Sequence, residues 1–113
     1  MHDYHKAKDM IEYAQKKAAE AGKDKISKIY LTFGESSGYS ADTILMYFQE
    51  ESAGTVCEGA EVVVKTIKAE LECPACHTVY PRKLLEYQCP SCGTEGQPSK
   101  ASTVIEITGV EFA

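Results

Sequence analysis

The sequence predicts an α+β fold, in which two helices cover a three-stranded mixed β-sheet and a small ribbon built on four cysteines is inserted into the chain. Two amphipathic helical segments and three β-rich segments share the chain, and paired Cys-x-x-C motifs separate the second β-rich segment from the third. With 113 residues, 43% of them hydrophobic, the chain can bury one modest core and a small satellite. We therefore expect an α/β domain from residues 1–70 plus 99–113 and an inserted ribbon from residues 71–98.

Two segments have the periodicity of amphipathic helices. From Tyr4 to Ala21, small and apolar residues recur at three- and four-residue steps among strong helix formers, and Asp3 is placed to cap the N-terminus of this helix. A second helix is expected from Ala41 to about Ser52, with Ser40 as its N-cap. The glycines expected to end the two helices are Gly22 and Gly54.

Three segments are rich in β-branched and aromatic residues. Ile26 to Phe33 alternates apolar and polar positions, which predicts a strand with one buried face. Glu61 to Leu71 leads directly into the first Cys-x-x-C motif, although its mixed pattern does not define a buried face. After an expected loop from Gly93 to Ser99, the strand Thr103 to Phe112 returns to pair with the first two.

Two matched Cys-x-x-C motifs, called hooks here, are separated by twelve residues. Two residues between the cysteines allow both thiolates of a hook to reach one tetrahedral ion at about 2.3 Å, so the pattern predicts a zinc ribbon. Two disulfides or a redox pair are the alternatives. Four thiolates leave no open coordination position, so we expect a structural site, and any chemistry must be sought elsewhere in the chain. The predicted zinc ligands are Cys73, Cys76, Cys89 and Cys92.

Charge and hydropathy exclude several classes of partner. The formal net charge is −5, opposite in sign to what phosphate neutralisation requires, so nucleic acid is not an expected partner. No apolar run near 18 residues and no secretory signal pattern occur, which predicts a cytoplasmic protein without a membrane span. A reducing compartment would also keep the fifth cysteine, Cys57, as a free thiol.

The first residues carry an unusual set of nitrogen donors. The α-amine of Met1, the backbone nitrogen of His2 and the Nδ1 atom of His2 can close two adjacent chelate rings, and the amide nitrogen or carboxylate of Asp3 can add a fourth donor. Deprotonated amides favour Ni(II) and Cu(II) over Zn(II) or Mg(II), because the former accept square-planar nitrogen coordination. The alternative is an ordinary solvated histidine near a frayed terminus. Ligand roles for His5 and His77 stay open at this stage.

Several short stretches, taken in order, resemble one family over essentially the whole chain. Besides the paired hooks, these stretches are Met1-His2-Asp3-Tyr4, Phe33-Gly34-Glu35, Ala53-Gly54-Thr55 and Glu58-Gly59-Ala60-Glu61. Together they resemble the HypA family of nickel-incorporation proteins in hydrogenase maturation. Each stretch alone is common, and the resemblance lies in their order and spacing.

The resemblance implies a nickel metallochaperone with two different metal sites. Nickel would be held by Met1, His2 and Asp3 in the α/β domain, while the four hook cysteines would hold zinc. The family hands Ni(II), with a partner GTPase, to the precursor of the [NiFe]-hydrogenase large subunit, and in some organisms assists urease through its accessory proteins. Asp3 departs from the family, which has a glutamate there, and its side chain is one methylene shorter. The alternative function is a zinc-ribbon module for protein–protein interaction without specific nickel binding.

Overall fold

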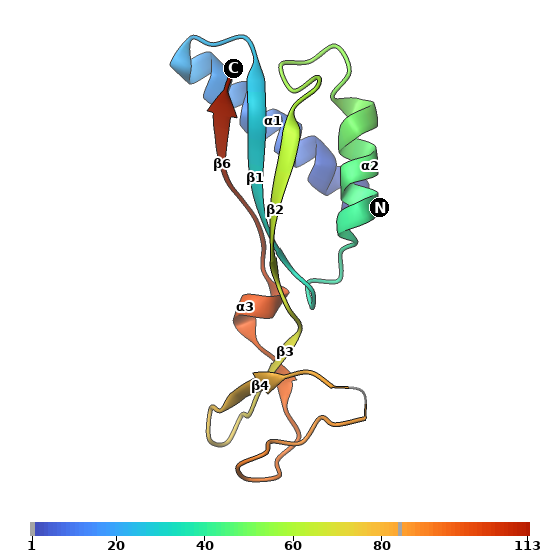
Figure 1. The fold of residues 1–113 in the computed structure, drawn as a ribbon, viewed down its shortest axis with the longest axis vertical. Helices are drawn as coiled ribbons and strands as arrows, with labels where there is room; N and C mark the ends of the chain where they lie inside the picture. Colours follow the sequence, from blue (N-terminus) through green and yellow to red (C-terminus); the bar gives the residue numbers. More distant parts are fainter. Residues whose placement is uncertain (1, 84) are drawn as a thin grey trace. The chain divides into compact units, whose positions relative to one another are not determined.

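The computed structural model describes residues 2–83 and 85–113, and these fall into two compact units (Figure 1). The α/β unit comprises the chain up to Thr32, together with Tyr39–Lys65 and Glu106–Ala113. The ribbon unit comprises Phe33–Gly38 and Thr66–Ile105. The domain boundaries expected from the sequence stay a prediction. No helix within the described ranges combines the length and the apolar character needed to cross a membrane.

Helix α1 spans His2–Ala21 and contacts helix α2, which spans Ala41–Glu51. The buried side chains of α1 form the stripe that the sequence predicts, and α1 crosses behind the strands of the sheet in Figure 1. This stripe consists of Ala7, Met10, Ile11, Ala14 and Ala18. The predicted N-cap at Asp3 is wrong, because α1 already includes His2 and Asp3 lies in its first turn. The carboxylate of Asp3 instead accepts a hydrogen bond from the backbone N–H of Ser40, at 3.1 Å.

Helix α2 begins as the sequence predicts. Ser40 has an extended backbone, with φ −113° and ψ 117°, and its Oγ atom accepts a hydrogen bond from the N–H of Thr43 at 3.3 Å. This N-cap satisfies one of the backbone donors that the first turn leaves without an intrahelical acceptor. Ile44 and Phe48 form the buried face of α2. Together with the stripe of α1, they cover one face of the sheet.

The main sheet has the strand order β2-β1-β6, with β2 at Glu61–Ile67, β1 at Ile26–Gly34 and β6 at Ile105–Phe112. Hydrogen bonds at the strand ends define the directions. The backbone N–H of Ile26, at the start of β1, donates to the carbonyl of residue 56, and the N–H that follows the end of β1 donates to the carbonyl of residue 67. Both residue numbers increase together, so β2 runs parallel to β1. On the other side, the residue just before β1 is hydrogen-bonded to residue 113 and the end of β1 to residue 104. The residue numbers run in opposite directions, so β6 is antiparallel to β1. The sheet is therefore mixed, as predicted, and the α+β fold class is confirmed.

A second sheet in the ribbon unit has the order β4-β3-β5. Its strands are β3 at Glu70–Glu72, β4 at Val79–Pro81 and β5 at Gln97–Pro98, and both pairings are antiparallel. The single strand predicted from Glu61 to Leu71 is thus two strands, and the loop predicted from Gly93 to Ser99 contains β5. Both errors have one cause: β3 pairs with β4 and β5, which follow the two hooks in sequence, and local sequence patterns do not report such pairing.

A short helix, α3 at Lys100–Thr103, precedes β6 and was not predicted. Ser99 caps it, because its Oγ atom accepts the N–H of Ser102 at 3.2 Å. The backbone of α3 lies against the end of β1: Ser36 N–H donates to the carbonyl of Ser102 at 2.7 Å, and Gly34 N–H donates to the carbonyl of Val104 at 2.7 Å. A Cβ atom at position 34 would overlap the carbonyl group of Ser102, so this approach requires glycine.

Candidate metal centre

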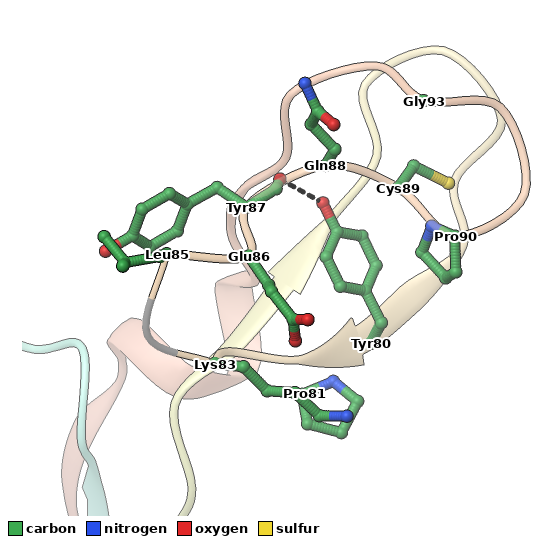
Figure 2. Close-up of a pocket in the computed structure, with 10 residues that line it drawn as sticks. All are labelled: Tyr80, Pro81, Lys83, Leu85, Glu86, Tyr87, Gln88, Cys89, Pro90 and Gly93. Atoms are coloured by element: carbon green, nitrogen blue, oxygen red, sulfur yellow. Dashed lines mark hydrogen bonds between the residues drawn. The ribbon is translucent and has the colours of Figure 1, made fainter.

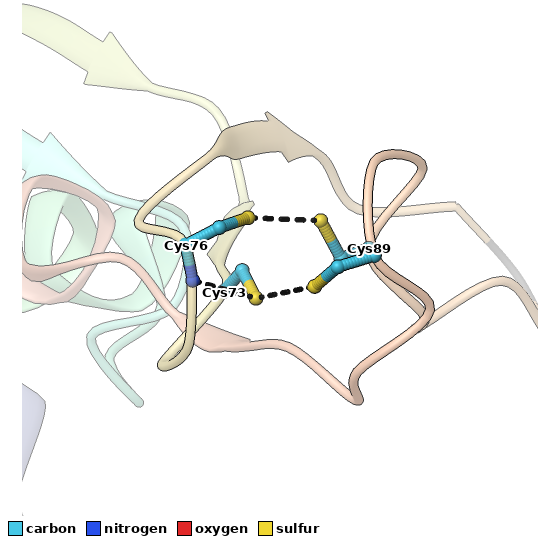
Figure 3. A group of neighbouring side chains, drawn as sticks. Cys73, Cys76 and Cys89 are labelled. Carbon is cyan, nitrogen blue, oxygen red and sulfur yellow. Dashed lines mark hydrogen bonds between the residues drawn. The ribbon is translucent and has the colours of Figure 1, made fainter.

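Four thiol groups converge in the ribbon unit. The Sγ atoms of Cys73, Cys76, Cys89 and Cys92 all lie within 4.8 Å of one another, and Figure 3 shows three of these side chains pointing toward a common centre. Sγ of Cys73 lies 3.3 Å from Sγ of Cys92, and Sγ of Cys76 lies 3.6 Å from Sγ of Cys89. A tetrahedral ion with metal–sulfur bonds near 2.3 Å requires sulfur–sulfur distances of about 3.8 Å. The donor set and its spacing therefore fit one tetrahedral ion.

The two hooks share the sequence Cys-Pro-x-Cys-x-Thr and repeat one pattern of backbone hydrogen bonds. In the first, the N–H of Cys73 donates to the carbonyl of Thr78 at 2.9 Å. In the second, the N–H of Cys89 donates to the carbonyl of Thr94 at 2.7 Å. Each hook is therefore a closed turn that fixes the direction of its own two thiols.

The residue after the second cysteine of each hook has a left-handed backbone conformation. His77 has φ 64° in the first hook and Gly93 has φ 78° in the second. Glycine adopts this conformation without steric cost, whereas histidine adopts it only uncommonly. The exposed ring of His77 lies near a carboxylate, with Nδ1 at 3.6 Å from Oε2 of Glu72. His77 is not part of the four-thiol group.

Contacts with neighbouring groups shift the pKa values of the hook thiols, raising that of Cys73 and lowering those of Cys76, Cys89 and Cys92. Backbone N–H groups contact the first cysteine of each hook, with 3.4 Å from Cys76 N to Cys73 Sγ. The Oγ1 atom of Thr78 lies 3.1 Å from Sγ of Cys76, and this contact lowers the pKa of the Cys76 thiol. The hydroxyl of Thr94 lowers the pKa of Cys92 in the same way, at 3.4 Å. Metal binding requires thiolates, so both contacts favour it.

The ribbon has a small core of its own, formed by Leu71, Cys73, Tyr80 and Cys89. Half of this core consists of hook cysteines, so the packing of the ribbon depends on their positions. The Oη atom of Tyr80 donates to the carbonyl of Tyr87 at 2.7 Å, beside a cavity of about 490 Å³ (Figure 2). This bond connects β4 to the chain that enters the second hook.

Two of the residues predicted to bind nickel, His2 and Asp3, lie at the start of α1. Met1 is outside the described residues. His2 is exposed, and its ring makes an edge-on contact with the ring of Tyr39, with 5.8 Å between centroids. Sequence reasoning did not identify Tyr39 or Ser40 as neighbours of this terminus, although the capping signal at Ser40 marks the turn that carries both. His5 contacts the ring of Tyr4 at 5.8 Å between centroids.

A mixed sheet covered by two helices, joined to a ribbon in which four thiols meet, defines a small α+β protein with a candidate metal site. The comparison with known families specifies the class further. Residues 1–112 match the family described as "Hydrogenase/urease nickel incorporation, metallochaperone, hypA". The chain belongs to this HypA family, and the resemblance noted in the sequence is confirmed.

Relatives and solved structures agree with this assignment. A protein named hydrogenase maturation factor HypA, from Roseiflexus sp., is 31% identical over 113 residues, covering 99% of this chain and 92% of the relative. Another with the same name, from Caldanaerobacter subterraneus subsp. tengcongensis, is 29% identical over 112 residues, with coverage of 99% and 93%. A structure titled "Solution structure of HypA protein" matches with a TM-score of 0.74 at 22% identity, covering 100% of this chain and 97% of that one. The Ni metallochaperone HypA from Helicobacter pylori matches with a TM-score of 0.65 at 20% identity, covering 97% and 96%.

Proposed function

We propose that this chain binds Ni(II) at its N-terminus and delivers it, with a partner GTPase, to the precursor of the [NiFe]-hydrogenase large subunit. Urease, reached through its accessory proteins, is the second client. Membership of a nickel-incorporation family carries this proposal. The exposed position of His2 at the beginning of α1 supports the assignment of the nickel site.

The proposed nickel ligands are the amine of Met1 and the backbone nitrogen and Nδ1 atom of His2, with Asp3 supplying the fourth donor. The first N–H groups of an α-helix have no intrahelical acceptor. The amides of His2 and Asp3 can therefore lose their protons and bind a metal without breaking a helical hydrogen bond. Such amide donors favour the square-planar geometry of Ni(II).

Asp3 offers two donor groups, and they differ in availability. Its carboxylate accepts the N–H of Ser40 at 3.1 Å, so binding of this oxygen to nickel would compete with that hydrogen bond. Its backbone N–H lies in the first turn of α1 and has no intrahelical acceptor, so metal binding at this nitrogen does not compete with a helical hydrogen bond. We therefore assign the amide nitrogen of Asp3 as the fourth ligand and the carboxylate as the group that holds the first turn of α1 against the turn before α2.

The hook cysteines are the proposed zinc ligands. Cys73, Cys76, Cys89 and Cys92 form a set that fits a tetrahedral thiophilic ion, and four thiolates leave no position for an exchanging ligand. Bound zinc would supply folding free energy to the ribbon and no chemistry. The proposed cytoplasmic location, a reducing compartment, would keep these thiols available for the ion.

Nickel binding to untagged, zinc-loaded protein tests the proposal. Titration by calorimetry should give one Ni(II) per chain in addition to zinc, and X-ray absorption should show nitrogen coordination without sulfur. His2→Ala should weaken nickel affinity by more than about tenfold, because a chelating ligand is lost. Lowering the pH should release nickel, because protons compete for the amine, amide and imidazole donors.

Two further variants make the test specific. A Gly-Ser extension ahead of Met1 removes the free amine from its place beside His2 and should weaken binding as His2→Ala does. His5→Ala is the matched control and should leave the affinity unchanged. Unchanged nickel affinity in both His2→Ala and the extended protein would exclude the proposed site. One zinc without any specific nickel would favour the interaction module instead.

A further inference from the structure

The ring of Tyr39 lies against the first turns of α1. Tyr39 directly precedes Ser40, the N-cap of α2, and its side chain is half-buried. The ring of His2 contacts it edge-on, with 5.8 Å between the ring centroids and 80° between the ring planes. The Nζ atom of Lys6, one helical turn further along α1, lies 5.8 Å from the centroid of the same ring. Residues four positions apart share one face of a helix, so the Tyr39 ring covers this face beside the first proposed nickel donors.

The backbone that carries this ring is fixed by three hydrogen bonds at the next residue. The N–H of Ser40 donates to the carboxylate of Asp3 at 3.1 Å, which joins the turn to α1. Its Oγ atom accepts the N–H of Thr43 at 3.3 Å, and its carbonyl accepts the N–H of Ile44 at 3.0 Å, which join the turn to α2. Asp3 directly follows His2 in the chain. The turn therefore contacts two adjacent residues of the proposed nickel site, one through a hydrogen bond and one through a ring contact.

Nickel chelation places a geometric demand on the His2 side chain. Its Nδ1 atom and its own backbone nitrogen must face the same ion, which restricts both side-chain torsions. The side chain of His2 is exposed, and an exposed side chain samples several rotamers that binding must then restrict at a cost in entropy. A neighbour that limits these rotamers before the ion arrives reduces this cost. The edge-on contact with Tyr39 is such a restraint, since its geometry is one that aromatic pairs prefer.

We propose that Tyr39 is a positioning residue of the nickel site, whose ring holds the imidazole of His2 so that Nδ1 stays beside the backbone donors. This inference rests on the proposed function, because it requires that nickel binds at His2. Tyr39 is not a ligand in this arrangement and acts only through the ring of His2. Removing its ring should therefore leave the ligands unchanged and increase the rate at which nickel dissociates.

A second aromatic contact of α1 shows what packing alone would do. Tyr4 contacts Tyr47 of α2 edge-on, with 5.4 Å between centroids and 82° between ring planes. Like Tyr39, Tyr47 is half-buried and contacts an aromatic residue in the first turn of α1. Its partner, however, is not a proposed nickel ligand. If Tyr39 served only to pack the start of α1, the two tyrosines would have the same effect on nickel binding.

Nickel titration of untagged, zinc-loaded variants tests the assignment. Tyr39→Leu removes the ring but keeps apolar bulk, and it should weaken nickel affinity by about threefold to tenfold. Tyr39→Phe keeps the ring and should bind nickel as the wild-type protein does. Tyr47→Leu is the matched control: urea denaturation should show a loss of stability similar to that of Tyr39→Leu, but nickel affinity should be unchanged. X-ray absorption of nickel-loaded Tyr39→Leu should show the same nitrogen coordination as the wild-type protein.

Two further measurements show whether Tyr39 acts through His2. In a double-mutant cycle, Tyr39→Leu should cause no additional loss of nickel affinity in the His2→Ala background, because the ring that it positions is absent. In nickel-free protein, nuclear Overhauser effects should connect the ring protons of the two residues, and the proton resonances of the His2 ring should shift in Tyr39→Leu. The second measurement is independent of nickel.

Several outcomes would overturn the assignment. These are unchanged or tighter nickel binding in Tyr39→Leu, an equal loss in Tyr39→Phe, an equal loss in Tyr47→Leu, or an additional loss in the His2→Ala background. A strong effect of His2→Ala together with none of Tyr39→Leu would overturn this inference alone. Unchanged affinity in His2→Ala itself would exclude the proposed nickel site, and this inference with it.

Discussion

At the scale of single residues, Gly96 decides how closely the two sides of the ribbon pack. A Cβ atom at this position would overlap Oη of Tyr80 and lie 3.0 Å from Cβ of Leu71. Both neighbours belong to the small ribbon core, and Oη of Tyr80 is held by its hydrogen bond to the carbonyl of Tyr87. The backbone of Gly96 also donates to the carbonyl of Tyr87, at 2.7 Å. A larger residue would therefore disturb the core and both hydrogen bonds.

Gly96→Ala should consequently lower the free energy of unfolding of the ribbon. Overpacking of this kind costs about 1–3 kcal/mol, and the displaced Tyr80 hydroxyl adds to it. Zinc retention against a competing chelator measures the effect, since metal binding and ribbon folding are coupled. Gly109→Ala is the matched control, because a Cβ atom there has no neighbour within 4 Å. Equal zinc retention in the two variants would contradict this account.

The residues of the candidate sites differed in how far the sequence could predict them. The convergence of the four hook cysteines could be predicted, because the Cys-x-x-C spacing indicates which thiols come together. The partners of these residues could not. Thr78 and Thr94 repeat in the sequence, but their contacts with the sulfur atoms of Cys76 and Cys92 are seen only in the structure. The contact of Asp3 with Ser40 joins residues that are 37 positions apart in the sequence.

At the scale of secondary structure elements, α2 is held at its start by side chains from two directions. The hydroxyl of Ser40 caps the N–H of Thr43, while the N–H of Ser40 donates to Asp3 on α1. The first bond stabilises α2, and the second connects the beginnings of the two helices. The start of α2 is therefore tied to the first turn of α1, which carries the proposed nickel donors.

Ser40→Ala should destabilise the protein by about 1 kcal/mol, because it removes the N-cap acceptor while the backbone N–H that contacts Asp3 remains. Urea denaturation followed by circular dichroism measures this change. Ser40→Asn should restore most of the stability, since asparagine also caps helices. A loss in Ser40→Asn as large as that in Ser40→Ala would show that the cap is not the cause.

Elements whose stability depends on their own sequence were predictable. Helix α1, helix α2 and strand β1 each have a complete period of buried residues, and the structure places them where this period predicts. Strands β3 and β5 and helix α3 have two to four residues each, which is too short to show a period. They exist because distant segments supply their hydrogen-bond partners: β3 pairs with β5, and the carbonyl of Ser102 in α3 accepts the N–H of Ser36, just after β1, at 2.7 Å.

At the scale of the whole molecule, the two units depend on metal to different degrees. The α/β unit has an apolar core that includes Met10, Ile29, Leu31 and Ile44. None of these core residues is a predicted metal ligand. The ribbon core contains Cys73 and Cys89, so only its stability is linked to the proposed zinc ion. Removal of zinc should therefore unfold the ribbon and leave the α/β unit folded.

Hydrogen exchange after treatment with a zinc chelator checks this expectation. The amides of Cys73, Cys89 and Gly96 should lose protection, while those in the middle of α1 should keep it. Thiol titration gives an independent count: chelation should expose four reactive thiols, and Cys57 should react only in denaturant. Cys57 is fully buried, and burial raises the pKa of its thiol, so little thiolate is present to react. Cooperative loss of protection in both units would contradict the prediction.

The two hooks repeat one pattern of sequence and of backbone hydrogen bonds around the four thiols. Each half contributes one buried thiol, Cys73 or Cys89, and one exposed thiol, Cys76 or Cys92. Each half therefore places one thiol where an incoming chelator can reach it, and the two approaches differ because His77 and Glu72 flank only the first hook.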